Sequence, residues 1–217
     1  MNHSQHFNLT IKRIVNLGGG GNMPHAFQQV EYLQSSGTQW IDTGIKAQSS
    51  TAISIDFAIL QGFSFSTYSF VFGAMIDATK ATSYSVAING ISSLRMPNGG
   101  SFQTVNISSL SYNQLTNIYY RNKQQKINDI QVSTLTANAN NTTNIALFWR
   151  NSDDRLSQTP TANLRIFSTR LYSDETLIRD FVPCYRKSDN VAGMYDFVSQ
   201  TFFINSGTGT FVVGPNV

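Results

Sequence analysis

Apolar and polar residues alternate along most of the chain after residue 30. In the segment TAISIDFAIL (51–60), every second residue from Ile53 to Ile59 is apolar, and the residues between them are small or polar. A period of two predicts an extended strand with one buried face and one exposed face. This pattern is the strongest structural signal in the sequence.

Similar short runs continue to the C-terminus, and turn-forming sequences such as PNGG and NSGTG separate several of them. Only one stretch, DETLIRD (174–180), is compatible with a helix. Many short strands and so little helix predict an all-β fold, an antiparallel two-sheet sandwich. The other predicted strands are YSFVFGAM (68–75), SYSVAIN (83–89), SFQTVNIS (101–108), NIYYRN (117–122), INDIQVS (127–133), NIALFWR (144–150), NLRIFSTRLYS (163–173), GMYDFV (193–198), TFFIN (201–205) and TFVVG (210–214).

The composition changes near residue 22. Four glycines at 18–21 form a predicted flexible hinge, and all three histidines, at positions 3, 6 and 25, precede the region of strands. We therefore expect an extended N-terminal arm with its glycine hinge at 1–22 and one folded domain at 23–217.

Charge is scarce in this sequence of 217 residues: charged residues make up 12%, and the net charge is +3. So small a charge argues against a nucleic-acid partner. No apolar run is long enough for a signal peptide or a membrane-spanning helix, so we expect synthesis in a cytoplasm and no membrane insertion.

The segment PCYRKSDNVAGMYDFV (183–198) contains the only cysteine, Cys184, together with Asp189 and Asp196. A cysteine nucleophile needs a base, usually histidine, or an electropositive setting. No histidine follows position 25, so the region of predicted strands offers no such base, and Cys184 lies between Pro183 and Tyr185 in an apolar strand. We therefore expect a buried structural thiol in a closing hairpin, with Gly193 allowing a bulge or a close strand approach.

Two stretches resemble a known family: VEYLQSSGTQWIDTGI (30–45) and RDFVPCYRKSDNVAGMYDFVSQTFFINSGTGTF (179–211). They are similar to concanavalin A-like lectin/glucanase modules of the LamG-like jelly-roll type, which occur in tailed-phage virion proteins and in surface proteins of gut bacteria. The resemblance implies two packed antiparallel sheets with the first and last strands close together. It implies no single function, because the fold hosts lectins, hydrolases and virion parts.

Glucanases of this fold place paired carboxylates on one strand face, typically as E-x-D-x-x-E. The two glutamates here, Glu31 and Glu175, are far apart in the sequence, and no such motif occurs. We therefore expect no enzymatic activity, with a glycan hydrolase as the least favoured alternative.

Lectins of this class often hold Ca²⁺ through loop carboxylates and carbonyls. Asn151, Asp153 and Asp154 form the best candidate cluster for such a site. The favoured interpretation is a solvated hairpin turn, so we expect no cofactor.

Sugar sites stack an aromatic ring on the sugar and surround it with polar groups. Trp40, Tyr119, Tyr120 and Trp149 are candidates by residue type. Both tryptophans lie in predicted strands, where a core role is an equal alternative. In the closing hairpin, Tyr195 and Phe203 are expected to face the interior.

The arm carries apolar residues Phe7, Leu9 and Ile11 on one face of an extended segment, followed by Lys12 and Arg13. Such a segment suits strand addition to a partner's sheet edge. The sequence thus favours a phage virion structural protein, a head fibre or capsid decoration protein, which the arm anchors to capsid or other virion proteins. A homo-oligomer, with a trimer as the preferred number, and a cell-surface glycan ligand are further expectations. A soluble carbohydrate-binding module is the main alternative.

Overall fold

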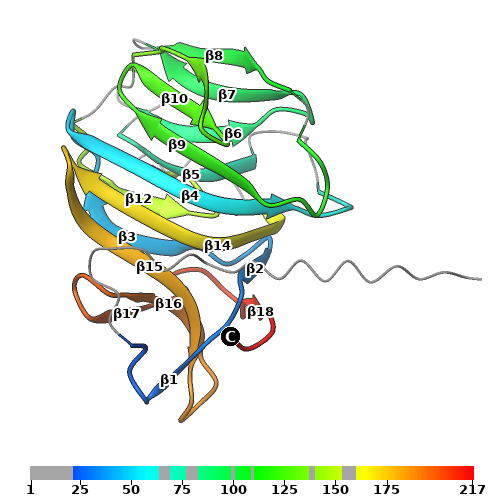
Figure 1. Ribbon diagram of the computed structural model, residues 1–217, viewed down its shortest axis with the longest axis vertical. Coiled ribbons are helices and arrows are strands. Elements are labelled where there is room, and N and C mark those ends of the chain that lie inside the picture. Colours follow the sequence, from blue (N-terminus) through cyan, green and yellow to red (C-terminus); the bar gives the residue numbers. More distant parts are fainter. Residues whose placement is uncertain are drawn as a thin grey trace, which may run out of the picture.

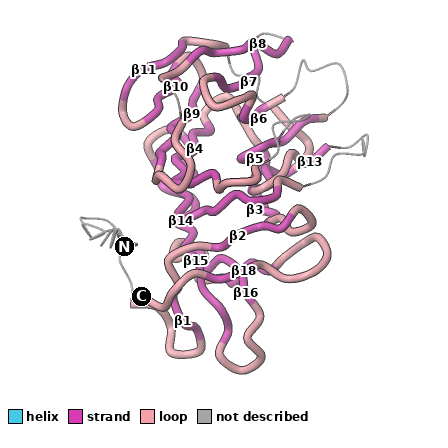
Figure 2. Tube along the Cα trace, turned by 90° about the vertical axis from the view of Figure 1, so that its right-hand side faces the viewer, coloured by secondary structure: helices cyan, strands magenta, loops and turns pink. Residues whose placement is uncertain are grey.

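The computed structural model describes residues 22–63, 69–76, 83–98, 101–108, 110–136, 140–152 and 160–217. Within these residues the chain forms one sheet of eleven strands and one of seven, and no helix. The two sheets pack face to face as layers (Figures 1 and 2). The fold is therefore the all-β, two-sheet antiparallel sandwich that the alternating pattern predicts.

In the large sheet the central strands follow the order β11-β10-β9-β4-β14-β15-β16-β17, with β1 beside β15, β2 beside β14 and β18 beside β2. These strands are β1 (Phe27–Gln29), β2 (Leu33–Ser36), β4 (Thr51–Ile59), β9 (Thr116–Arg121), β10 (Gln124–Ile127), β11 (Ile130–Ser133), β14 (Ala162–Ser173), β15 (Thr176–Arg186), β16 (Ala192–Asp196), β17 (Thr201–Ile204) and β18 (Val212–Val213).

In the small sheet the order is β3-β12-β5-β6-β7-β8, and the short β13 pairs with β5 in the one parallel pairing that the described residues contain. These strands are β3 (Ile41–Lys46), β5 (Ser69–Met75), β6 (Tyr84–Ile88), β7 (Ser93–Asn98), β8 (Ser101–Asn106), β12 (Asn144–Leu147) and β13 (Asn151–Ser152).

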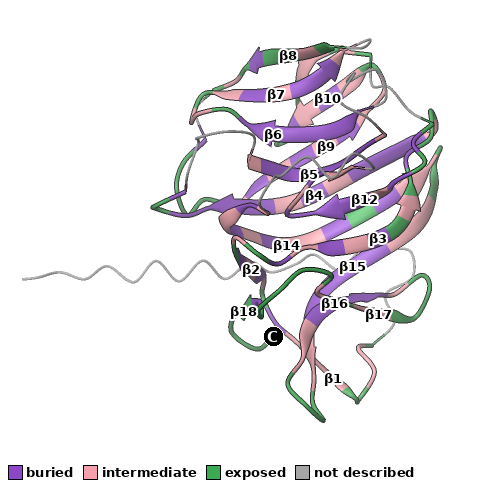
Figure 3. Cartoon of the chain, turned by 180° about the vertical axis from the view of Figure 1, so that it is seen from behind, coloured by how far each residue is buried: buried purple, intermediate pink, exposed green. Residues whose placement is uncertain are grey.

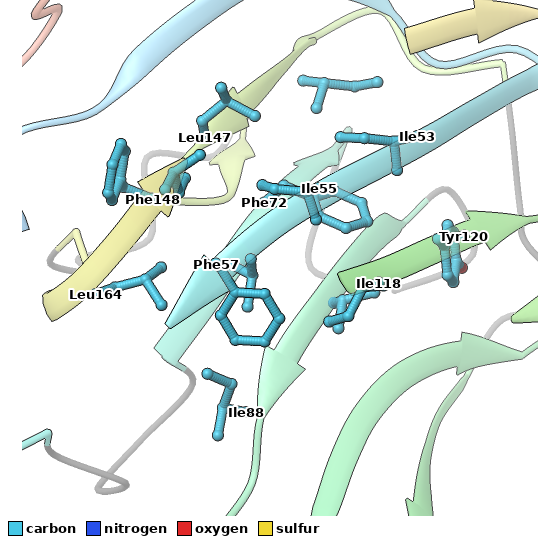
Figure 4. Packing of buried hydrophobic residues seen from close by; sticks show 14 of the residues in the cluster. Ile53, Ile55, Phe57, Phe72, Ile88, Ile118, Tyr120, Leu147, Phe148 and Leu164 are labelled. Carbon is cyan, nitrogen blue, oxygen red and sulfur yellow. The ribbon is translucent and has the colours of Figure 1, made fainter. Parts of the chain in front are cut away.

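The core lies between the two sheets and follows the predicted alternation. Ile53, Ile55 and Phe57 of β4 point inward and are at most 1% exposed. Figure 4 shows their side chains with Phe72 of the small sheet between the layers. In the small sheet, β5 and β6 are buried along nearly their whole length and are mostly purple in Figure 3. Burial of these apolar side chains is the main favourable term for folding.

The first and last described segments lie side by side, as the resemblance implies. Val30 and Asn216 form an antiparallel bridge, and the Val217 N–H donates to the Gln29 carbonyl at 3.1 Å. Strands β1, β16, β17 and β18 gather with the C-terminus at one end of the molecule (Figure 1). The first and last strands of the described residues therefore lie at the same end of the sandwich.

One predicted strand is wrong, and the one helix-compatible stretch does not form a helix. The helix-compatible stretch 174–180 is a turn followed by β15, because pairing with β14 and β16 overrides a weak helical preference. The predicted strand 127–133 is a hairpin: Asn128 and Asp129 have φ angles of 47° and 66° and join β10 to β11. Asparagine and aspartate tolerate this left-handed conformation better than most residues.

The closing hairpin β16–β17 is confirmed, with one correction. Met194 pairs with Phe203, and both contact the core, whereas Tyr195 pairs with Phe202. Neighbouring residues on a strand point to opposite faces, so Tyr195 lies on the other side of β16. It is still buried there, at 6% exposed, and packs against Phe27 with 5.2 Å between ring centroids. Of the two residues expected inside, Phe203 is partly buried against the core between the sheets, whereas Tyr195 is buried in a separate aromatic cluster.

Gly193 permits a close strand approach, one of the two roles expected for it. A Cβ at this position would lie 2.3 Å from the Phe203 carbonyl oxygen, and the pairing on both sides of β16 continues without a bulge. Any side chain here would therefore push β16 and β17 apart.

Across the described residues, no helix has the length and apolarity that crossing a bilayer requires.

Candidate functional site: the outer face of the large sheet

The four aromatic candidates do not form one site. Trp40 and Trp149 lie against each other, with ring centroids 4.8 Å apart, next to the small sheet. Trp40 also packs on the core, and the backbone at Gly207 approaches it so closely that a Cβ would lie 2.9 Å from its ring. This pair therefore contributes to packing at the rim of the sandwich.

Tyr119 and Tyr120 point to opposite sides of β9. Tyr120 is fully buried and contacts Tyr84 and Phe72 in the core, so it offers no face to a sugar. Tyr119 is half-buried on the outer face of the large sheet. Of the two adjacent candidates, only Tyr119 can contact a ligand.

The predicted Ca²⁺ cluster is only partly visible. Asn151 lies in β13 and pairs with Ala74 of β5, while Asp153 and Asp154 lie outside the described residues. Among the residues that the structure does describe, no group of three or more metal-ligating side chains of the His, Cys, Asp and Glu types comes together.

Tyr119 belongs to a row of polar side chains that crosses five strands. The strand register aligns these residues on one side of the sheet, opposite the core. In order across β10, β9, β4, β14 and β15, they are Lys126, Tyr119, Ser54, Arg170 and Asp180. We use the term outer face for the centre of this surface, made of Ser54, Asp56, Asn117, Tyr119, Ser168, Arg170 and Tyr172.

Asp56 is held at the middle of the outer face by its neighbours. The Asn117 side-chain amide donates to Asp56 Oδ1 at 2.8 Å, and the Ser168 hydroxyl donates to Asp56 Oδ2. The same amide of Asn117 also donates to Ser54 Oγ at 3.1 Å. A carboxylate fixed in this way is a ready acceptor for ligand hydroxyl groups, because its remaining lone pairs keep a defined direction.

An ion pair and a cation–π contact lie beside the aromatic rings of this face. Arg170 Nε donates to Asp180 Oδ1 at 3.1 Å, and Lys126 Nζ lies 5.8 Å from the centroid of the Tyr119 ring. Burial raises the pKa of Tyr172 above the ordinary phenol value, and the nearby Arg170 only partly opposes this shift. The Tyr172 hydroxyl therefore stays protonated at neutral pH and can both donate and accept hydrogen bonds.

Ala52 is covered although it lies on the outer side of β4. It sits on the same side of β4 as Ser54 and pairs with Tyr172, yet it is only 1% exposed. A methyl group on an outward-facing position can be covered only by larger side chains around it. Its cross-strand neighbour Tyr172, which is half-buried, is the large side chain placed to cover it.

The thiol region has no features of a catalytic site. Burial raises the pKa of Cys184 to about 12, and the side chain is fully enclosed. Asp189 pairs with Arg186 at 2.6 Å, and Asp196 accepts hydrogen bonds from the backbone of the β16–β17 turn. The two carboxylates hold turns and do not activate the thiol.

Sequence reasoning missed Arg170, Tyr172 and the network around Asp56 as site residues. Their signal was present in the alternation of β4, where Ser54 and Asp56 fall between the apolar residues Ile53, Ile55 and Phe57. Only the pairing of β4 with both β9 and β14 shows that these positions meet on one surface.

The fold and this surface define an all-β sandwich with a polar, aromatic outer face. No protein-family model matches the sequence, and no curated protein matches it.

Proposed function

We propose that this chain is a non-enzymatic, lectin-like display protein of a phage virion, a head fibre or capsid decoration protein that binds glycans through the outer face. The observation that carries the proposal is the combination of Tyr119, Tyr172, Arg170 and the held carboxylate of Asp56 on one sheet surface. Aromatic rings among oriented hydrogen-bonding groups are typical of sugar sites.

The resemblance to concanavalin A-like jelly rolls gains support from where its two stretches lie. The side-chain oxygen of Asn205, in the second stretch, accepts a hydrogen bond from the backbone N–H of Trp40, in the first, at 3.1 Å. The Ser206 N–H donates to the Trp40 carbonyl, and the Thr208 N–H donates to the Thr38 carbonyl. The two SGT segments, 36–38 and 206–208, belong to the two stretches that carry the resemblance, and these backbone hydrogen bonds join them directly.

Display on a particle suits the arrangement of the chain ends. β1 and the C-terminal residues lie at the same end of the molecule (Figure 1). A tether attached at this end would leave the outer face on β4, β9 and β14 free. The proposed anchor residues Phe7, Leu9, Ile11, Lys12 and Arg13 lie outside the described residues, and their attachment to a capsid remains a prediction.

The carboxylates of the outer face favour binding over hydrolysis. Both oxygens of Asp56 already accept hydrogen bonds, from Asn117 and from Ser168. Asp180 is also committed to Arg170.

Two measurements test this proposal. Mass spectrometry of purified phage particles should detect the protein as a stoichiometric component. Glycan-array binding should fall at least tenfold in Tyr119→Ala, while Tyr112→Ala, which alters an exposed tyrosine of the loop before β9, should bind as the native protein does. Glycan binding without incorporation into particles would instead indicate the alternative, a soluble carbohydrate-binding module.

A further inference from the structure

Arg165 is the feature of the outer side of the large sheet that the proposed site does not use. It lies on β14, on the same side as Arg170, and pairs with Ala58 of β4 and Gln34 of β2. Its guanidinium carbon lies 4.0 Å from the centroid of the Tyr32 ring, and its Nε donates to Gln34 Oε1 at 3.0 Å. Two contacts therefore hold the guanidinium in place.

The Tyr32 ring is itself fixed. Phe167 meets it edge-on at 5.5 Å between centroids, and the backbone at Gly214 lies so close that a Cβ there would be 2.8 Å from Tyr32 Cδ1. A guanidinium stacked on a rigid ring has lost much of its rotamer freedom before any ligand arrives. Such preorganisation lowers the entropic cost of binding.

Arg165 has no carboxylate partner among the described residues, unlike four other arginines of the large sheet. Arg121, Arg170, Arg179 and Arg186 each form an ion pair with an acidic side chain. The two terminal nitrogens of Arg165 are the edge of a planar fork that matches a carboxylate or sulfate.

The surroundings of this fork are apolar. Ala58 beneath it is 3% exposed, and Val212, which pairs with Gln34 on the same side, is 51% exposed. An ion pair beside such groups is stronger than one in open water because the local dielectric is lower. The apolar surface of Val212 and Phe167 would also meet the carbon-bearing face of a sugar ring.

We propose that Arg165, held by Tyr32 and Gln34, binds the acidic group of a carboxylated or sulfated sugar in a glycan that continues along β14 onto the outer face. The proposal rests on the glycan-binding function proposed above. Ser168 follows Phe167 directly and donates to Asp56, so the Arg165 cluster and the outer face are continuous. From Arg165 to Arg170 the strand rises about 15 Å, enough for a short oligosaccharide.

The test uses the full chain on an array of neutral, carboxylated and sulfated glycans. Acidic glycans are expected to bind, and Arg165→Gln is expected to lower their affinity about tenfold or more, as the loss of a charged hydrogen-bonding partner predicts. Arg165→Lys keeps the charge but loses the fork, so it should restore only part of the affinity. Replacing the ligand's carboxylate by an alcohol should match the effect of Arg165→Gln.

Arg186→Gln is the matched control. Arg186 also stacks near a ring, 5.7 Å from Phe202, but already holds Asp189, so its loss should leave glycan affinity unchanged. Melting temperatures check that each variant is folded. Measuring carboxylated and sulfated glycans separately identifies which acidic group the protein prefers. Equal binding of polyglutamate would overturn the assignment to a glycan.

The failures are distinguishable. Binding of neutral glycans alone, lost in Tyr119→Ala but kept in Arg165→Gln, would overturn this inference and leave the proposed function intact. Acidic-glycan binding unchanged in Arg165→Gln would do the same. Absence of all glycan binding would remove the sugar-binding part of the proposed function and this inference together.

Discussion

Two buried tyrosines in contact have different hydrogen-bonding environments. The Tyr84 hydroxyl lies 3.1 Å from the carbonyl oxygens of both Thr51 and Tyr120, which share its single proton. The Tyr120 hydroxyl is buried and has no partner among the described residues. Burial raises the pKa of both phenols, so each stays neutral across the physiological range.

Tyr84→Phe is therefore expected to lower the free energy of unfolding by about 1 kcal/mol or more, because buried carbonyls lose their donor. Tyr120→Phe should leave stability unchanged or raise it, since it removes an unsatisfied buried group. Urea unfolding of the two variants provides the comparison. An equal loss in both would mean that the Tyr120 hydroxyl has a partner.

Cys184 should react with thiol reagents only when the protein unfolds. Its pKa rises from an ordinary 9.0 to about 12 in the folded state, mainly through burial, so the folded protein holds the proton that the unfolded chain releases. The resulting stabilisation is complete below pH 9 and is lost as the pH rises toward 12. Stability should fall less steeply over this window in Cys184→Ala.

The measurement is the free energy of unfolding against pH for both proteins, with labelling of native Cys184 at pH 7.5. Tyr84 and Tyr120 also favour the neutral form, so both proteins should lose stability at alkaline pH, and only the difference reports on Cys184. Fast stoichiometric labelling of the folded protein, with loss of glycan binding, would contradict a structural role.

At the scale of elements, the closing hairpin joins the end of the chain to the core. The Phe203 ring meets Phe181 edge-on, with 5.0 Å between centroids, and Arg179 lies 5.6 Å from it. Phe203→Ala should lower the free energy of unfolding by about 3 kcal/mol, the lower end of the range for losing an aromatic side chain from a core.

Val198→Ala is the control within the same hairpin. This side chain is 44% exposed in the turn, so its loss should change stability by less than about 0.5 kcal/mol. Similar losses in the two variants, measured by denaturant unfolding, would mean that Phe203 does not anchor the hairpin.

For the whole molecule, deletion of residues 1–22 should leave the melting temperature of the body nearly unchanged. The body's first strand, β1, begins at Phe27 and is held by β15 independently of the deleted residues. The deletion should at the same time remove the protein from phage particles, because the proposed anchor is lost. Calorimetry and particle mass spectrometry give the two readouts.

A variant with Phe7, Leu9 and Ile11 changed to Asn keeps the arm's length and both of its charges, and it should also fail to enter particles. Full occupancy of particles by the truncated protein would refute the anchor. Oligomer number, with a trimer expected, can be read from light scattering of the same samples.

Glycan affinity should depend on assembly. One polar sheet surface offers weak binding, whereas copies fixed on a particle can gain roughly 10²–10⁴ in avidity. Particles carrying the protein should therefore bind a glycan-coated surface far more tightly than the free protein does. Equal affinities would indicate a single tight site instead.

The sequence by itself determined the fold class and much of the core. The alternation in β4 predicted which side chains are buried, because side chains alternate between the two faces of a strand and burial of apolar surface is favourable. It also predicted the enclosed thiol of Cys184 and the close approach at Gly193, since both depend on local residue types.

Only the tertiary structure decided which polar residues meet. Tyr119 and Tyr120 are adjacent in the sequence, and the choice of which one faces the solvent depends on how β9 registers with β4. Tyr32 and Arg165 lie more than a hundred positions apart and come into contact because β2 pairs with β14. Strand register is set by contacts between distant segments, and no local pattern encodes which distant partner a polar side chain will have.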